Sequence, residues 1–136
     1  MSRMIFVNLP VADLDRSVTF WTELGFSFNP QFGDEHAACL TISDLACVML
    51  LSQRYFSQFT RKPLVDAASH TEAIMALSAE SRDEVDRLAE RALAVGGSAS
   101  NPSQDEDYLY ARSFADPDGH LWEVLHLDPA AIEQLA

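Results

Sequence analysis

The stretch Asp116–Val124 reads DPDGHLWEV and decides the fold. Its first four residues are typical of a tight turn, because proline fixes one backbone angle and glycine accepts the left-handed conformation. The flanking segments Tyr108–Phe114 and His120–Leu127 are rich in the aromatic and aliphatic residues that strands favour. The stretch therefore predicts an antiparallel hairpin near the end of the sequence.

The residues before this hairpin predict a strand followed by a helix. Glu72–Ala79 alternates as a strand does, with Ile74 and Ala76 on one face. Ser81 opens a Ser-x-x-Glu capping box, and the apolar stripe within Val85–Leu93 has helical spacing. A weaker strand is expected within Ser98–Gln104.

The first half of the chain has the same order of elements. Met4–Val11 predicts a strand in which Phe6 and Asn8 share one face. A helix capped by Asp13 follows, and Gly25 occupies the position of a left-handed residue after its end. Three further strands are expected at Phe26–Phe32, His36–Ile42 and Ala46–Ser52.

This repetition predicts an α+β fold of two βαβββ modules, which form a curled mixed sheet around a cavity and carry the helices on the outer face. We expect a single domain over residues 1–136. Its parts are module one at 4–53, a connector at 54–71, module two at 72–127 and a C-terminal tail at 128–136. The connector is too apolar for a free linker, so we expect it to be packed with a short helix, as a functional cover or as a plug over the core.

Composition excludes several classes of partner. The 136 residues carry 9 Lys and Arg against 21 Asp and Glu, a net charge of −12, which repels nucleic acid and anionic membranes. The purest apolar run, Ala46–Leu51, is far shorter than the ~20 residues of a membrane span. Cys39 and Cys47 form no CxxC pair, are too few for a disulfide scaffold, and are interpreted as small hydrophobic residues in strands. We therefore expect a cytoplasmic protein.

The paired module pattern, the DPDGHLWEV hairpin and the helix sequence VADLDRSVTFW at Val11–Trp21 resemble the vicinal oxygen chelate superfamily. That superfamily includes glyoxalase I, extradiol dioxygenases, and the bleomycin-resistance and fosfomycin-resistance proteins. The resemblance covers Met4 to Leu127 and is nearest to small bacterial predicted lactoylglutathione lyases. It implies a homodimer, a small-molecule ligand, and a divalent metal (Zn, Ni or Fe) that chelates two oxygens of the substrate.

The resemblance also implies four inward metal-ligand positions, which in this sequence are Phe6, Met49, Ile74 and Glu123. Only Glu123 has an oxygen donor, and the Met49 thioether is a poor ligand for hard divalent ions. The residues therefore predict that the usual metal site is largely absent. Glu123 is the candidate catalytic base or residual metal ligand.

Glu123 on the inward face is expected either to find a protein partner or to stay solvated near a cavity mouth. If Asp116 and Gly119 pair across the turn, Arg112 lies opposite Glu123 and offsets its charge. If the register shifts by one residue, Ala111 lies there and Arg112 turns to the other face.

Three functional hypotheses follow. The first is a glyoxalase-like lyase or isomerase acting on a small oxygen-rich substrate. The second is a non-catalytic protein that binds or sequesters a ligand, as the bleomycin-resistance members do. The third is an interaction protein with a vestigial cavity. Tyr108, Tyr110 and Trp122 then lie on its partner surface, although core packing is the commoner role of such aromatic residues. Under the first two, the expected ligand contacts are Phe6, Asn8, Met49, Ile74 and Arg112.

Overall fold

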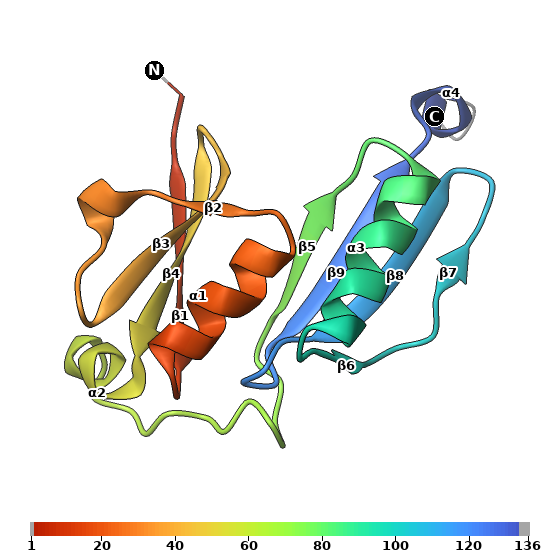
Figure 1. The fold of residues 1–136 in the computed structure, drawn as a ribbon. Helices are drawn as coiled ribbons and strands as arrows, with labels where there is room; N and C mark the ends of the chain where they lie inside the picture. Colours follow the sequence, from red (N-terminus) through yellow and green to blue (C-terminus); the bar gives the residue numbers. More distant parts are fainter. Residues whose placement is uncertain (1, 134–136) are drawn as a thin grey trace. The chain divides into compact units, whose positions relative to one another are not determined.

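The computed structural model describes residues 2–133 and contains two mixed sheets with helices, an α+β fold (Figure 1). The elements in chain order are β1 (Ile5–Val11), α1 (Leu14–Glu23), β2 (Ser27–Phe28), β3 (Ala37–Ser43), β4 (Ala46–Ser52), α2 (Gln53–Phe56), β5 (Ile74–Ser78), α3 (Arg82–Ala94), β6 (Ser98–Ala99), β7 (Gln104–Asp105), β8 (Leu109–Ala115), β9 (Leu121–Leu127) and α4 (Pro129–Glu133). Short 3-10 helices lie at Pro30–Phe32 and Ser57–Phe59. Within residues 2–133, no helix is long and apolar enough to span a membrane.

The two sheets repeat one topology. The first has the strand order β1-β4-β3-β2, and the second has the order β5-β9-β8-β6 with β7 also paired to β8. In each sheet the first strand runs parallel to the last strand of its module, and the other pairs are antiparallel. The repeated strand–helix–strand pattern predicted from the sequence is confirmed.

The first unit, which extends to Val65, has its core between α1 and one face of the first sheet. The Asp13 carboxylate accepts a hydrogen bond from Arg16 N at 3.1 Å and caps α1 as predicted. Phe20 and Trp21 of this helix are fully buried, as are Leu40 and Leu50 of the sheet. This apolar contact holds the helix on the sheet.

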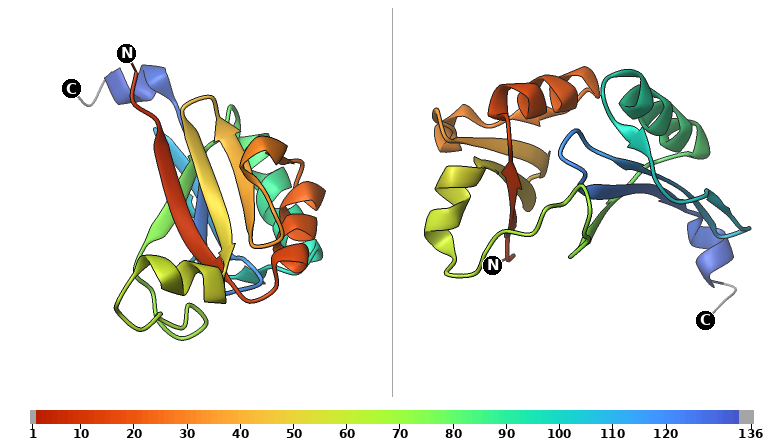
Figure 2. Two further views of the ribbon diagram at one scale, coloured as in Figure 1. Left: turned by 90° about the vertical axis from the view of Figure 1, so that its left-hand side faces the viewer. Right: turned by 90° about the horizontal axis from the view of Figure 1, so that it is seen from below.

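The second unit, from Asp66 onward, has its core between α3 and one face of the second sheet (Figure 2). The predicted capping box forms in a modified way, because Ser81 caps Glu84 N while the Glu84 carboxylate accepts from Glu80 N. Trp122 and Val124 of β9 are fully buried on this face. Burial of Trp122 agrees with core packing, the commoner role expected of it, and rules out a place for it on an exposed partner surface.

Two predicted strands are shorter than expected, and proline explains both. The expected strand Phe26–Phe32 stops after β2, because Pro30 begins a 3-10 helix that the Asn29 side chain caps. The expected strand Ser98–Gln104 is divided into β6 and β7, since the intervening residues around Pro102 leave the ladder.

The connector and the tail contain the short helices that the sequence predicts. The connector includes α2 and the following 3-10 helix, where Tyr55 stacks against His36 and contacts Phe59 edge-on. In the tail, α4 begins at Pro129 and is capped by the Asp128 side chain. Residues 134–136 of the expected tail lie outside the described part of the chain.

Candidate functional site

The turn between β8 and β9 sets the register of the strands that carry the site. Asp116 N donates to the carbonyl oxygen of His120 at 3.0 Å, and Gly119 N donates to that of Asp116 at 2.9 Å. Three residues therefore lie in the loop, with Gly119 in the left-handed region at φ 94°. This loop length places Ser113 opposite Glu123.

Neither Arg112 nor Ala111 therefore lies opposite Glu123, but the register is shifted by one residue and Arg112 turns to the other face, as the second alternative predicts. Arg112 lies opposite Val124, on the face that α3 covers, and Ala111 lies opposite Leu125. The Arg112 guanidinium contacts two carboxylates of α3, Glu90 at 2.8 Å and Asp86 at 3.2 Å. The hydrogen bond to Glu90, followed by the one to Asp86, raises the pKa of Arg112. The predicted pairing of Arg112 with Glu123 does not occur.

Glu123 lies instead on the face of the second sheet opposite to α3. Its cross-strand neighbours are Ser113 on β8 and Ala76 on β5, both of which have small side chains. Leu121 and Leu125 precede and follow it on the same face of β9. Among the described residues, none forms a hydrogen bond or an ion pair with the Glu123 side chain. The carboxylate is therefore available to a ligand.

A cavity of about 320 Å³ opens beside Glu123. Its other walls are formed by the β6–β7 loop and by β8, through Asn101, Pro102, Gln104, Ala111 and Ser113. Arg112 also borders it, although its guanidinium is held by α3. The volume is in the range of pockets that hold small molecules.

Ser113 holds the loop that closes this cavity. Its hydroxyl accepts a hydrogen bond from Asn101 N at 2.8 Å and donates one to the carbonyl oxygen of Asn101 at 3.1 Å. Because the hydroxyl hydrogen is already donated to the loop, Ser113 is suited to positioning Asn101 and not to nucleophilic attack. Glu123 is thus the one acidic side chain on the described wall of the cavity.

The residues at the four metal-ligand positions that the resemblance implies do not fit a divalent ion. Phe6 and Ile74 have no donor atom, and Met49 offers only a thioether. Within residues 2–133, no group of three or more His, Cys, Asp or Glu side chains is placed to hold a metal ion. Glu123 alone gives a single protein ligand, which is fewer than the three that catalytic zinc sites use.

The structure places the other predicted ligand contacts in two separate groups. In the first unit, Phe6, Asn8 and Met49 lie on the face of the sheet opposite to α1, with Asn8 directly beside Met49. In the second unit, Ile74 lies beside Leu121 and shares the face of Glu123. That the two groups contact one ligand stays a prediction.

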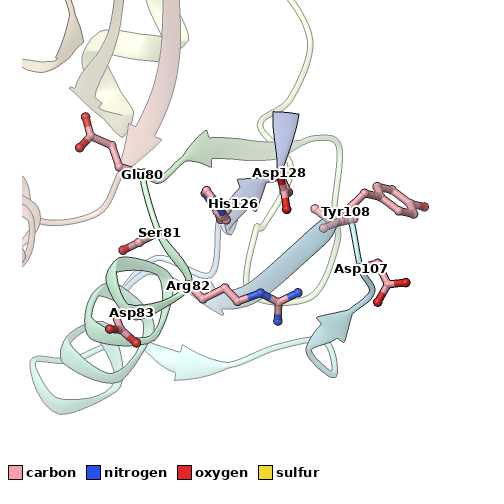
Figure 3. A pocket seen from close by; sticks show the side chains of 9 residues that line it. Glu80, Ser81, Arg82, Asp83, Asp107, Tyr108, His126 and Asp128 are labelled. Carbon is pink, nitrogen blue, oxygen red and sulfur yellow. The ribbon is translucent and has the colours of Figure 1, made fainter. Parts of the chain in front are cut away.

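A second cavity, of about 370 Å³, lies at the start of α3 and was not predicted from the sequence (Figure 3). Arg82 crosses it and pairs with Asp105 at 2.7 Å and with the carbonyl oxygen of Glu106 at 2.8 Å. His126 also lines it, and its Nδ1 is hydrogen-bonded to the carbonyl oxygen of Ala79 at 3.0 Å. Because these polar groups bind other parts of the unit, the cavity is a weaker candidate than the one beside Glu123.

Comparison with known proteins supports the fold. Residues 3–43 match the family model of the bleomycin resistance protein-like N-terminal domain. No curated protein matches the chain.

Several solved structures are similar over almost the whole chain. The hypothetical protein SA1046 from S. aureus is 25% identical with a TM-score of 0.78, and the match covers 93% of this chain and 94% of that one. A glyoxalase/bleomycin resistance protein/dioxygenase family enzyme from Burkholderia phytofirmans PsJN is 16% identical with a TM-score of 0.76, covering 93% and 100%. The fosfomycin resistance protein FosX from Mesorhizobium loti is 20% identical with a TM-score of 0.65, covering 100% and 97%.

Two independent findings thus agree with the resemblance seen in the sequence. Residues 3–43 match a bleomycin-resistance-like family model, and the fold of both modules is found in proteins of the glyoxalase group. The chain therefore has the glyoxalase/bleomycin resistance/dioxygenase fold of the vicinal oxygen chelate superfamily.

Proposed function

We propose that this protein binds a small oxygen-rich molecule in the cavity beside Glu123. The observation that carries the proposal is a carboxylate without a protein partner among the described residues, on the wall of a cavity of about 320 Å³. A carboxylate that is removed from water requires a hydrogen-bond donor, so a ligand that displaces water there must supply one.

The other walls suggest the chemistry of the ligand. The amide groups of Asn101 and Gln104 can donate and accept hydrogen bonds, whereas Pro102 and Ala111 are apolar. A small hydroxycarbonyl compound matches this arrangement, because its hydroxyl can donate to Glu123 and its carbonyl can accept from an amide. The matching of donors to acceptors favours such a compound over an anion, which Glu123 would repel.

Two finer functions fit this site, and each has its own support. A lyase or isomerase is favoured by Glu123 itself, since a carboxylate next to a bound carbonyl compound can remove a proton from the adjacent carbon. A non-catalytic binding or sequestering protein is favoured by the match of residues 3–43 to the bleomycin-resistance-like family. The positions that the resemblance implies for a metal supply one oxygen donor, a set that does not fit a divalent metal.

Binding can be tested with dihydroxyacetone as the probe, followed by two-dimensional NMR of the full chain. We expect amide shifts to change at Asn101, Gln104, Ser113 and Glu123. Glu123→Gln keeps the size of the side chain and removes its charge, so it should weaken binding about tenfold, the effect of losing one charge-assisted hydrogen bond. Glu72→Gln changes the net charge equally on an exposed residue outside the cavity and should leave binding unchanged. Equal affinity of wild type and Glu123→Gln would reject the site.

Turnover separates the two finer functions. The hemithioacetal of methylglyoxal and glutathione is the substrate to test, with metal analysis of the same purified protein. Turnover that Glu123→Gln abolishes supports the lyase or isomerase, and binding without turnover supports the sequestering protein. Stoichiometric Zn, Ni or Fe that is required for turnover would contradict the conclusion that the donor set does not fit a divalent metal.

A further inference from the structure

Three sulfur-containing side chains occupy neighbouring positions on one face of the first sheet. Cys39 of β3 lies directly opposite Met49 of β4 in the antiparallel register, and Cys47 precedes Met49 by two residues on the same strand. Residues with these relations point to the same side of a sheet. This is the face opposite to the one that carries Leu40 and Leu50 against α1.

The two cysteines are diagonal neighbours. Cys47 lies opposite Thr41, which places Cys39 two residues along β3 on the same face of the β3–β4 pair. Directly opposite residues have Cβ atoms ~4.5–5.5 Å apart, and the long flexible methionine side chain can adjust its thioether to a nearby group. The register therefore allows the Met49 sulfur to approach the thiol pair.

A disulfide suits this geometry less well than a shared ligand. Diagonal neighbours in a sheet have Cα atoms ~7–8 Å apart, whereas disulfides usually join Cα atoms ~4.4–6.8 Å apart. Both cysteines are free thiols. An atom placed between the sulfurs does not require the strands to move closer.

The surroundings of the three sulfurs favour a soft ion over a hard one. Cys39 is 3% exposed and Cys47 is 6% exposed. On the neighbouring strand β1, Phe6 lies beside Cys47 and Asn8 lies beside Met49, so the adjacent positions supply no carboxylate. Thiolate and thioether donors select copper(I), zinc and iron–sulfur clusters, while carboxylates and carbonyls select magnesium, calcium and manganese. Structural zinc sites and iron–sulfur clusters use four protein ligands, which is more than these three sulfurs supply, so the set fits copper(I) best.

We propose that Cys39, Cys47 and Met49 form a binding site for copper(I), with two thiolates and one thioether as ligands. The ion keeps its oxidation state on binding. The two S–H bonds break, both protons pass to solvent, and the sulfurs bind the ion with a net site charge of −1. The site lies in the first unit and is independent of the cavity beside Glu123.

The first test is anaerobic titration of the full chain with copper(I) in competition with the chelator bicinchoninate. We expect one ion per chain and a thiolate-to-copper absorption band in the ultraviolet. X-ray absorption of the wild-type complex should show three sulfur neighbours, without nitrogen or oxygen. Two sulfur neighbours only, or binding of several ions without a band of fixed stoichiometry, would overturn the three-sulfur site.

Variants assign the ligands, with a matched control. Cys39→Ala and Cys47→Ala should each lower the affinity more than about tenfold, since removal even of supporting groups around a metal costs ~10–100-fold. Met49→Leu should lower it to a smaller extent, and Met75→Leu, at another half-buried strand methionine, should leave it unchanged. Circular dichroism checks that each variant is folded. The X-ray absorption measurement uses only the wild type, so it tests the site even if a variant fails to fold. Unchanged affinity in Met49→Leu or in either cysteine variant would contradict the proposal.

Discussion

The guanidinium of Arg112 lies 2.8 Å from the carboxylate of Glu90, on the side of the second sheet that α3 covers. This ion pair connects the centre of β8 to the middle of α3 and explains why Arg112 is not available to Glu123. The Glu123 carboxylate, on the face opposite to α3, therefore has no cation from Arg112 beside it. Arg112 instead stabilises the packing of α3 on the other face of the sheet.

We predict that Arg112→Met destabilises the protein by about 0.5–1 kcal/mol, because the methionine keeps the buried stem and removes the charge. The effect is small since Glu90 is largely exposed. A double-mutant cycle with Glu90→Gln in urea unfolding should give a coupling energy that decreases with added salt. Dihydroxyacetone binding should not change. A loss of binding equal to that of Glu123→Gln would contradict the assignment of Arg112 to α3.

A second prediction concerns Asp116, which is 5% exposed. Its carboxylate accepts hydrogen bonds from Trp122 Nε1 and from the backbone N–H groups of Asp118 and His120, each at 3.0 Å. Asp116→Ala should cost about 2–4 kcal/mol of unfolding free energy, because it leaves several donors unsatisfied near the core. Asp44→Ala in an exposed turn should change it by about 0.5 kcal/mol or less. Similar urea midpoints for the two variants would contradict this role.

A third prediction uses two glycines with similar backbone angles. Gly119 has φ 94°, and a Cβ atom there would lie 2.7 Å from the carbonyl oxygen of Ala67. Gly25 has φ 99°, but a Cβ atom there would meet nothing within 4 Å. Both alanine variants introduce a left-handed alanine, which costs about 1–2 kcal/mol. Gly119→Ala should cost more, because the segment around Ala67 must also move.

The difference between these variants in thermal or urea unfolding measures the packing of that segment on the turn. We expect Gly119→Ala also to increase proteolysis near Ala67, which Gly25→Ala should not do. Equal destabilisation without increased cleavage would show that the close approach is relieved at no cost.

The sequence predicts the elements well and the register of the final hairpin badly. Alternation and capping residues are local signals, so Asp13 and Ser81 mark the starts of both long helices correctly. The turn sequence DPDG fits a two-residue or a three-residue loop, and only the hydrogen bond from Asp116 N to His120 decides between them. One residue of difference moved Arg112 to the opposite face of the sheet.

The position of Cys47 as a diagonal neighbour of Cys39 could not be predicted for a related reason. The seven residues between them include a turn and a register irregularity near Ser43, and this combination sets the relation. From the sequence they read as small hydrophobic residues, which their burial also supports. The position of Glu123 on the face opposite to α3, in contrast, followed from alternation with Trp122 and Val124.

The last prediction concerns the dependence of stability on pH through Cys47. Burial, and then the hydrogen bond from Cys39 and its charge, raise the pKa of the Cys47 thiol to about 11. In the unfolded chain a thiol has a pKa of ~8.5. The folded state therefore holds the proton more tightly, so the stabilisation is complete at pH values below the unfolded pKa. It is lost as the pH rises from there towards about 11.

Urea unfolding of wild type and Cys47→Ala at several pH values between 7 and about 10 should reveal this difference. The wild type should lose up to ~1.4 kcal/mol more per pH unit in the alkaline part of the range, because its unfolded state releases one more proton there. Alkylation of the folded wild type by iodoacetamide should stay slow at pH 8.5 for the same reason. Parallel pH profiles for the two proteins, together with rapid alkylation of Cys47 at pH 8.5, would show that the thiol has its ordinary acidity in the folded state.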